Sequence, residues 1–292
     1  MMKLLITGAT GFIGSRLAAQ ALACGHEAHA LLRAESDATR LRAGIMAHRD
    51  DGNLEAILSA IAPDAVLHLA TRYQHGHTHA DIAPMLAANI VFGARLADAA
   101  ARTGVRGFVS LGSAAQFAGE DHASPATLYA ASKQAFDVLL AAIARGSGLP
   151  TATLIVFDTF GPGDTRGKIL DRMIAAARTG TPLDLSPGEQ AIDLVHVEDV
   201  VDAILMAAEG LVTGSLQPGG RFALSSGQAV TLRALAGRVS AALGRPVPAR
   251  WGALPYRAGE IMQPWRGGAA LPHWRAARSL DAFLAEAAGA PP

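Results

Sequence analysis

The stretch Lys3-Leu-Leu-Ile-Thr-Gly-Ala-Thr-Gly-Phe-Ile-Gly14 decides the fold of this chain. The apolar run over Lys3–Thr7 predicts a short buried strand, and a helical pattern over Phe12–Cys24 follows it. The three glycines between them allow a tight turn in which the backbone closely approaches a ligand. Because a helix N-terminus carries partial positive charge, strand, turn and helix in this order predict a site for the pyrophosphate of a dinucleotide, rather than a turn kept small only for packing.

Strand-like and helix-like segments alternate through the first 160 residues. The later strand candidates are Glu27–Leu32, Ala65–Leu69, Gly107–Leu111 and Thr153–Phe157, and helical periodicity covers Ala83–Ala101, Leu128–Ala144 and Val200–Ala208. Repeated strand–helix units predict an α/β protein with a Rossmann-type, doubly wound parallel sheet and helices on both of its faces.

After Phe160 the alternation weakens, turn signals multiply, and all three tryptophans follow in the last part of the chain. This change in composition predicts a smaller, irregular substrate-binding domain set over the carboxyl edge of the sheet. We expect residues 1–160 and about 188–210 to form the dinucleotide-binding domain. Residues of about 161–187 and 211–292 would then form the substrate-binding domain.

Composition limits the possible partners and location. Lys+Arg and Asp+Glu both count 25, so the formal net charge is zero and nothing draws the whole chain to nucleic acid or an anionic membrane. Cys24 is the single cysteine, which fits a reducing compartment. Met1–Leu5 runs directly into a strand, which leaves no room for a signal peptide. We find no apolar stretch of about 18 residues that would span a membrane, so we expect a cytoplasmic protein.

The end of the second predicted strand favours NADP(H), with NAD(H) as the other possibility. An acidic residue there would hydrogen-bond the adenosine ribose hydroxyls. This chain has Arg33 instead, and Arg33 with Arg16 could hold a 2′-phosphate by bidentate hydrogen bonds, unless both are solvated surface charges. Asp50 or Asp51 could contact the adenine edge or could be an ordinary loop acid.

Tyr129 and Lys133 have the helical spacing that puts both side chains on one face. A phenol titrates near about pH 10, and a neighbouring ammonium group with a cationic nicotinamide would lower its pKa toward the working range. Ser113, at a predicted strand end, could bind the reacting oxygen while Tyr129 moves the proton. With the glycine turn, these groups predict redox chemistry at a carbon–oxygen bond.

These residues resemble the extended short-chain dehydrogenase/reductases that act on nucleotide sugars, and the resemblance covers nearly the whole chain. The motifs that carry it are Thr7-Gly-Ala-Thr-Gly-Phe-Ile-Gly14, His68-Leu-Ala70, Leu111-Gly-Ser-Ala-Ala-Gln-Phe117, Tyr129-Ala-Ala-Ser-Lys133, Phe160-Gly-Pro-Gly-Asp164 and Asp193-Leu-Val-His-Val-Glu-Asp-Val200. The resemblance implies a catalytic triad of Ser113, Tyr129 and Lys133, and a homodimer formed through the Tyr129 helix and its neighbour. Together with the residues argued above, the full set of expected cofactor contacts is Gly8, Thr10, Gly11, Phe12, Ile13, Gly14, Arg16, Arg33, Asp51, Leu69, Ala70, Thr71, Lys133 and Phe157.

The chain departs from the family pattern directly after Ser113. The 4,6-dehydratases of this family carry an Asp-Glu pair there, which acts as acid and base, whereas this chain has Ala114-Ala115. Neither alanine can move a proton, so we expect no dehydration. Asp158 stands where many relatives have a substrate-contacting asparagine, and Phe160 replaces the usual tyrosine.

The expected substrate contacts are basic or lie close to the triad. Arg166 and Lys168 could hold the diphosphate of a sugar nucleotide, if they are not simply solvated. Arg257 lies in Leu254–Trp265, a segment similar to one in reductases that make deoxysugar nucleotides. The full expected set is Asn89, Ala114, Asp158, Arg166, Lys168 and Arg257. The alternating histidines at 75, 77 and 79 have no adjacent acid or cysteine apart from Asp81, so we expect a polar loop and no metal.

The leading hypothesis is an NADPH-dependent reductase of the 4-keto group of a nucleotide-activated (deoxy)hexose, similar to CDP-abequose or CDP-paratose synthases. An NAD-dependent nucleotide-sugar 4-epimerase is the alternative, since it would use the same three residues. A non-catalytic NADP-binding regulator is a more distant one.

Overall fold

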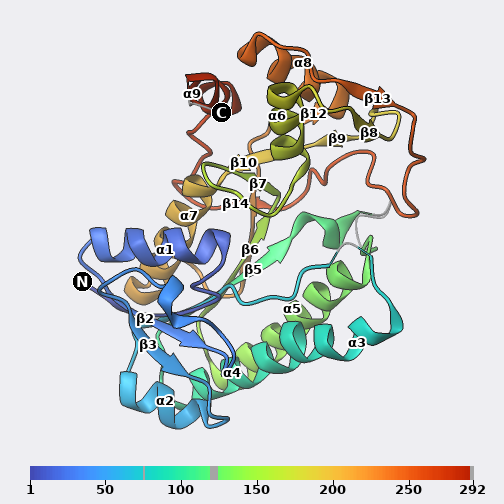
Figure 1. The fold of residues 1–292 in the computed structure, drawn as a ribbon. Helices are drawn as coiled ribbons and strands as arrows, with labels where there is room; N and C mark the ends of the chain where they lie inside the picture. The colour runs from blue at the N-terminus through green and yellow to red at the C-terminus, as the bar shows by residue number, and fades with distance from the viewer. Residues whose placement is uncertain (75, 119–123, 290–292) are drawn as a thin grey trace.

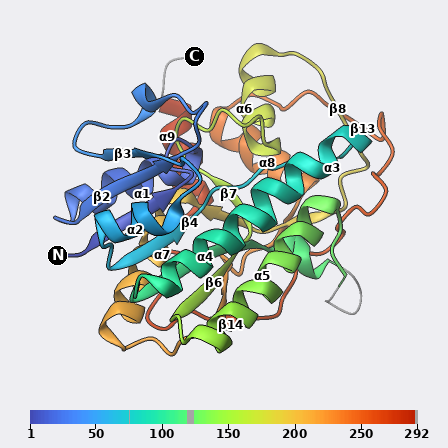
Figure 2. The same ribbon diagram turned by 90° about the horizontal axis from the view of Figure 1, so that it is seen from below.

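The computed structural model describes residues 1–74, 76–118 and 124–289 (Figures 1 and 2). Its centre is an eight-stranded sheet in the order β14-β11-β6-β5-β4-β1-β2-β3, in which every pair of neighbours is parallel. The strands are β1 Lys3–Thr7, β2 Glu27–Leu32, β3 Met46–Arg49, β4 Ala65–His68, β5 Gly107–Ser113, β6 Thr151–Val156, β11 Gly220–Leu224 and β14 Ala269–Ala270. The expected Rossmann-type sheet is confirmed.

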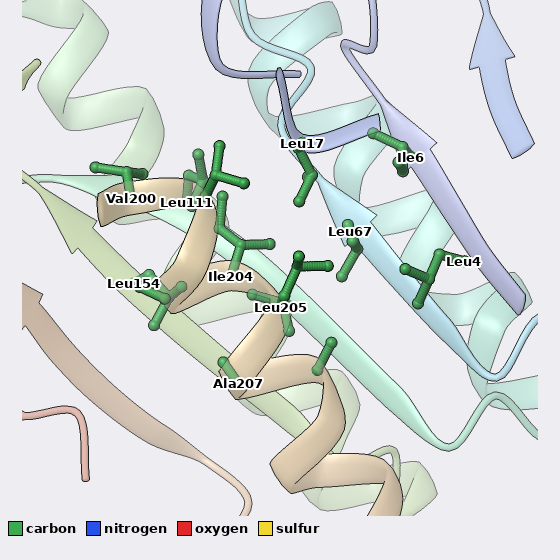
Figure 3. Packing of buried hydrophobic residues seen from close by; sticks show 14 of the residues in the cluster. Leu4, Ile6, Leu17, Leu67, Leu111, Leu154, Val200, Ile204, Leu205 and Ala207 are labelled. Atoms are coloured by element: carbon green, nitrogen blue, oxygen red, sulfur yellow. The ribbon is translucent and has the colours of Figure 1, made fainter. Parts of the chain in front are cut away.

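Helices cover both faces of this sheet because its central strands β1, β4 and β5 are buried on both sides. Leu4 and Ile6 of β1 share one core with Leu17 of α1 (Phe12–Ala23) and Ile204 of α7 (Val197–Thr213), as Figure 3 shows. Leu5, which points the other way, belongs to a second core. That core includes residues of α2 (Leu54–Ile61), α4 (Phe92–Arg102) and α5 (Leu128–Ser147). Continuous apolar strands of this kind are typical of parallel sheets buried on both faces.

The register brings three strand ends together at the carboxyl edge. Thr7 of β1 lies opposite His68 of β4, and His68 lies opposite Ser110 of β5. The segments that follow these strands are the glycine turn, the loop to α3 and the 3-10 turn η3 (Ala114–Phe117). The chain therefore converges on one edge, where ligands of open α/β sheets bind.

One helical run is longer than the sequence predicts. It passes from α3 (His79–Leu86) through a π-turn, η2 (Ala87–Val91), into α4, and Figure 2 shows α4 beside α5. By length and composition the run His79–Arg102 is apolar enough to span a membrane, so the expectation of no such stretch is wrong. The run packs against α2 and α5 and contributes Leu96 to a core, so it is a core helix of this fold.

A smaller unit continues from the carboxyl end of β6. It contains α6 (Ile169–Thr179), α8 (Leu232–Leu243) and α9 (Leu280–Gly289), which share a third core. Its short strands pair as β7 (Asp158–Phe160) with β10 (Leu194–His196), β9 (Ala191–Ile192) with β12 (Val230–Thr231), and β8 (Leu183–Leu185) with β13 (Ala249–Trp251).

The division between the two units differs from the sequence-based boundary. Strands β11 and β14 lie in the expected substrate-binding segment 211–292, yet both join the large sheet. Helix α7 also extends beyond the expected limit of about 210, to Thr213. The cause is a long-range strand pairing, in which β11 pairs with β6 and Phe222 lies opposite Leu154. No local sequence pattern predicts this pairing.

Candidate active site

The glycine turn is closed by the end of β4. Gly8 has a φ of +72°, and a Cβ added to it would lie 2.9 Å from the backbone nitrogen of Ala70. A Cβ on Gly14 would lie 2.1 Å from the carbonyl oxygen of Gly8. Gly11 is the N-cap of α1, and no side chain of the described residues caps this helix. The free amides of its first turn and the close backbone therefore fit a dinucleotide pyrophosphate.

Below the turn, Thr7 and His68 form a buried pair whose protons can be assigned. The Thr7 Oγ1 accepts hydrogen bonds from the backbone N–H groups of Leu69 and Ala70, both at 3.1 Å. Its own hydrogen therefore goes to His68 Nδ1, 2.9 Å away, which leaves the imidazole proton on Nε2. Burial, together with the nearby charge of Lys133, lowers the pKa of His68 to about 3. His68 is thus a neutral neighbour of Lys133.

Tyr129 stands in the first turn of α5 and is covered by the loop after β4. Thr127 caps this helix by accepting from the backbone N–H of Ala130 at 3.1 Å. The rings of Tyr129 and Tyr73 meet edge to face with centroids 4.9 Å apart. The pKa of Tyr129 is raised to about 12: burial is the main cause, a hydrogen bond with Thr71 acts against it, and the neighbouring Tyr73 adds to the rise. The lowering of this pKa that the sequence predicts depends on a bound nicotinamide, and in the protein alone desolvation outweighs the other effects.

Lys133 lies one turn further along α5 and is buried. Burial lowers the pKa of its ammonium group to about 8, while the negative charge of Asp137 acts in the opposite direction. The α5 helix thus carries Tyr129, Lys133 and Asp137 at successive helical spacings. Asp137 is a residue that the sequence analysis missed, although its spacing from Lys133 was a usable signal.

Asn89, in the π-turn η2, is buried and hydrogen-bonded within the protein. Its Oδ1 accepts from Thr71 Oγ1 at 3.0 Å and from the backbone N–H of Arg72 at 2.6 Å. Its Nδ2 donates to Ser132 Oγ at 2.9 Å and to the Arg72 carbonyl at 3.1 Å. Asn89 therefore joins the loop after β4 to α5, which differs from the substrate contact expected of it.

Ser113 ends β5 and begins the 3-10 turn that packs against α5. Its Oγ accepts from the backbone N–H of Ala115 at 3.3 Å, so the hydroxyl hydrogen is available to another acceptor. Its backbone N–H donates to Gln116 Oε1 at 2.7 Å. Gln116 is fully buried, and its Nε2 has no partner among the described residues. The Ser-x-x-Gln spacing of a capping box would have identified Gln116 from sequence.

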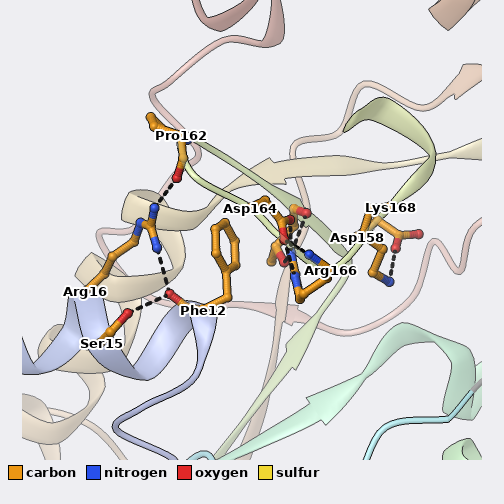
Figure 4. Close-up of polar contacts among 9 residues, drawn as sticks. Phe12, Ser15, Arg16, Asp158, Pro162, Asp164, Arg166 and Lys168 are labelled. Carbon is orange, nitrogen blue, oxygen red and sulfur yellow. Dashed lines mark hydrogen bonds and ion pairs between the residues drawn. The ribbon is translucent and has the colours of Figure 1, made fainter. Parts of the chain in front are cut away.

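Two arginines enclose the ring of Phe12 at the start of α1, as Figure 4 shows. The guanidinium carbons of Arg16 and Arg166 lie 4.3 and 4.2 Å from the ring centroid. Arg16 also donates to the Phe12 and Pro162 carbonyls and pairs with Glu198 of α7 at 3.2 Å. The structure thus directs Arg16 toward α7 and the loop after β7, rather than toward a 2′-phosphate.

The expected diphosphate ligands are paired with acids. Arg166 donates to both carboxylate oxygens of Asp164, whose side chain is 1% exposed, and to the Thr159 carbonyl at 3.0 Å. Lys168 pairs with Asp158 at 3.1 Å, and its Nζ lies 4.9 Å from the ring centroid of Tyr73 (Figure 4 shows the two ion pairs). Both cations are thus drawn toward neighbouring carboxylates, which the sequence analysis did not foresee.

Arg33, by contrast, extends from the end of β2 into solvent. Its side chain is 70% exposed and pairs with Glu35 at 3.2 Å. Arg49 of β3 donates from one nitrogen to the carbonyls of Arg33, Ala34 and Ser36 and so holds this loop in shape. Asp51, expected near the adenine, accepts from the backbone N–H of Asn53 at 2.9 Å.

The C-terminal segment reaches the site through Trp265. Its indole stacks on Phe117 of η3, with ring centroids 4.2 Å apart, and lies parallel to Phe157 at 6.4 Å. Phe157, an expected cofactor contact, is thus covered by Trp265. Arg257 is exposed, and its backbone N–H donates to Glu260 Oε2 at 3.4 Å.

The histidine-rich loop has no metal-site geometry within residues 1–74, 76–118 and 124–289. No group of three or more His, Cys, Asp or Glu side chains that could hold a metal ion occurs there. His77 and His79 are exposed. His75 lies outside the described residues.

A glycine turn on a parallel sheet, with Ser113, Tyr129 and Lys133 beside its carboxyl edge, defines a dinucleotide-dependent enzyme of the Rossmann type. Residues 4–216 match the model of the NAD dependent epimerase/dehydratase family. The chain belongs to this family, which confirms the resemblance seen in the sequence.

Relatives of known activity agree on the family and differ in reaction. The UDP-glucose 4-epimerase of Mycolicibacterium smegmatis is 30% identical over 269 residues, 84% of each chain. The CDP-abequose synthase of Yersinia pseudotuberculosis is 46% identical over 52 residues, 18% of each chain. A UDP-glucose 4-epimerase of Thermotoga maritima, solved with UDP-glucose, superposes with a TM-score of 0.86 at 22% identity, over 99% of this chain and 98% of that one.

Proposed function

We propose that this chain reduces the 4-keto group of a nucleotide-activated (deoxy)hexose with NADPH. The observation that carries the proposal is the combination of Tyr129, which holds its proton at neutral pH, with Ala114 and Ala115 beside Ser113. A protonated phenol suits the donation of a proton to a newly formed alkoxide. Without an acid–base pair next to Ser113, removal of water from the sugar has no proton carrier.

Each residue of the triad has a separate task in this proposal. NADPH, bound along the glycine turn, supplies the hydride. Ser113 donates a hydrogen bond to the carbonyl oxygen at C4, because its own Oγ already accepts from Ala115. Tyr129 protonates that oxygen as its negative charge develops. Lys133 binds the nicotinamide ribose and stabilises the phenolate that Tyr129 leaves behind.

The preference for NADPH rests on Arg33. It stands at the end of β2, where a carboxylate would favour NAD, and its guanidinium is solvent-exposed and free to turn from Glu35. A 2′-phosphate would accept bidentate hydrogen bonds from such a group.

A 4-epimerase is the second candidate, favoured by the 30% identical M. smegmatis relative, whose name is UDP-glucose 4-epimerase. An epimerase would use the same triad but keep NAD bound and consume no cofactor. The two candidates therefore differ in cofactor balance.

The experiment is to release and identify any nucleotide bound to the purified protein, then to follow NADPH oxidation with a panel of 4-keto sugar nucleotides. We expect turnover that consumes NADPH in proportion to product. Tyr129→Phe should lose about 10²- to 10⁴-fold in turnover while binding NADPH normally. Stoichiometric bound NAD with no net NADPH consumption would instead establish the epimerase, and full activity of Tyr129→Phe would remove Tyr129 from its role.

A further inference from the structure

Asp137 is a buried carboxylate one helical turn beyond Lys133. Both side chains are buried, with relative exposures of 6% for Asp137 and 4% for Lys133. Residues at this spacing on a helix are neighbours, and the interaction between their charges is screened little inside a protein. Asp137 forms its ion pair with Arg221 rather than with Lys133, so its charge acts on the ammonium group of Lys133 at longer range, across one turn of the helix.

Side chains from two strands of the sheet hold the Asp137 carboxylate in place. Its Oδ1 accepts from Thr153 Oγ1 of β6 at 2.9 Å, and Thr153 in turn lies 3.1 Å from Ser110 Oγ of β5. Its Oδ2 pairs with Arg221 Nε of β11 at 2.7 Å. A cavity of about 650 Å³, lined by Asp137, Thr153 and Arg221 among others, opens beside it.

Within the described part of the chain, Asp137 is the group that supplies negative charge near Lys133. His68 of β4 is neutral, as its hydrogen bonding with Thr7 requires. Tyr129 of α5 is protonated at neutral pH. Arg221 of β11 reaches Asp137 and so opposes the effect of the carboxylate on Lys133. The α4 helix presents Phe92 and Gly93 toward the His68 ring rather than a charge.

We propose that Asp137, fixed by Thr153 and Arg221, is the positioning residue that keeps the buried ammonium group of Lys133 in its charged form. The inference rests on the proposed function, in which a charged Lys133 binds the nicotinamide ribose and supports Tyr129. Arg221 partly neutralises Asp137, so the pair sets how strongly Lys133 holds its proton.

The test is the pH dependence of NADPH-coupled reduction. Asp137→Asn removes a negative charge at nearly constant shape, so Lys133 loses its proton at a lower pH than in the wild type. The alkaline limb of the pH profile should move to lower pH by about one unit. Loss of the negative charge at Asp137 would also lower the pKa of Tyr129. The alkaline limb should therefore move to lower pH whether it reflects the titration of Lys133 or that of Tyr129.

Two further variants separate charge from structure. Arg221→Met leaves the charge of Asp137 uncompensated, so the alkaline limb should move to higher pH, opposite to Asp137→Asn. Asp137→Glu retains the charge, and the adjoining cavity has room for the added methylene, so the limb should stay at the wild-type position. A purely structural role would lower activity in all three variants without opposite shifts.

The outcomes distinguish this inference from the proposed function. If Lys133→Met and Tyr129→Phe abolish turnover but Asp137→Asn and Arg221→Met leave the alkaline limb unmoved, only the role of Asp137 is overturned. If Lys133→Met keeps full activity, the proposed function of the site itself fails. Thermal melting of each variant identifies any that do not fold. If Asp137→Asn does not fold, the direction in which Arg221→Met moves the alkaline limb still tests the proposal.

Discussion

Single cations near the site are distinguished by the carboxylates around them. Arg166 and Lys168 form ion pairs with Asp164 and Asp158. Arg33 pairs with Glu35, and both of these side chains are about two-thirds exposed to solvent. Exposed pairs of this kind contribute little energy and are easily exchanged. Arg33 is therefore the cation best placed to take a new anionic partner.

Replacing Arg33 tests this at the cofactor. We expect Arg33→Ser to lower kcat/KM for NADPH by about tenfold or more, the value of one charge-assisted hydrogen bond, and to leave NADH nearly unchanged. Steady-state kinetics with both cofactors measure it. Arg102→Ser, at an arginine 62% exposed and also ion-paired, is the matched control and should affect neither cofactor. Equal losses with NADPH and NADH would rule out a 2′-phosphate contact.

Among the elements, the β1–α1 unit is packed so closely that the glycine turn leaves no space for a side chain at Gly14. The carbonyl of Gly8 fills the place that a side chain at Gly14 would occupy, so strand and helix approach backbone to backbone. The α5 helix has the opposite character at Gly146, where a Cβ would meet nothing within 4 Å. Glycine is thus required by packing in one helix and not in the other.

Alanine substitution should separate these two helices. Gly14→Ala should destabilise the fold by about 3 kcal/mol, because the new methyl group overlaps a backbone carbonyl and the turn must shift. Gly146→Ala should stabilise it by about 0.5–1 kcal/mol, through reduced chain entropy in the unfolded state. Urea unfolding of both variants gives the values, and a Gly14→Ala protein as stable as the wild type would contradict the packing described.

At the scale of the whole molecule, Asp199 of α7 joins the C-terminal segment to the unit built on the large sheet. Its side chain is 2% exposed and accepts from the backbone N–H groups of Ala277 and Arg278 at 3.1 and 3.0 Å. It also pairs with the Arg278 guanidinium, and Trp274 Nε1 donates to its carbonyl at 2.8 Å. A single buried carboxylate thus fixes the direction of the chain before α9.

Asp199→Asn should cost about 1–3 kcal/mol, since a buried charged acceptor is lost and Arg278 loses a partner. Limited proteolysis should then cut the C-terminal segment sooner. Asp202→Asn is the control: Asp202 pairs with the same arginine at 2.8 Å but is 41% exposed, so its loss should cost less than about 0.5 kcal/mol. If both substitutions lowered the free energy of unfolding equally, burial of Asp199 would not account for the attachment of the C-terminal segment.

Local patterns predicted much of the fold and part of the site. The strands β1 and β2 have the predicted bounds, because apolar runs between turn residues are a local signal. The helical spacing of Tyr129 and Lys133 is likewise local. The pairing of β11 with β6, however, joins segments far apart in the chain, and no local pattern in either segment predicts the strand with which it pairs.

By itself, the sequence determined the β1–α1 turn, the parallel sheet, the family and the helix that carries Tyr129 and Lys133, since spacing and hydrophobic period act over a few residues. Only the tertiary structure decided which carboxylates hold Arg166 and Lys168, that burial raises the pKa of Tyr129, and that Arg221 faces Asp137. Burial and charge pairing depend on segments that meet only after folding, so the electrostatic character of the site is a property of the folded chain.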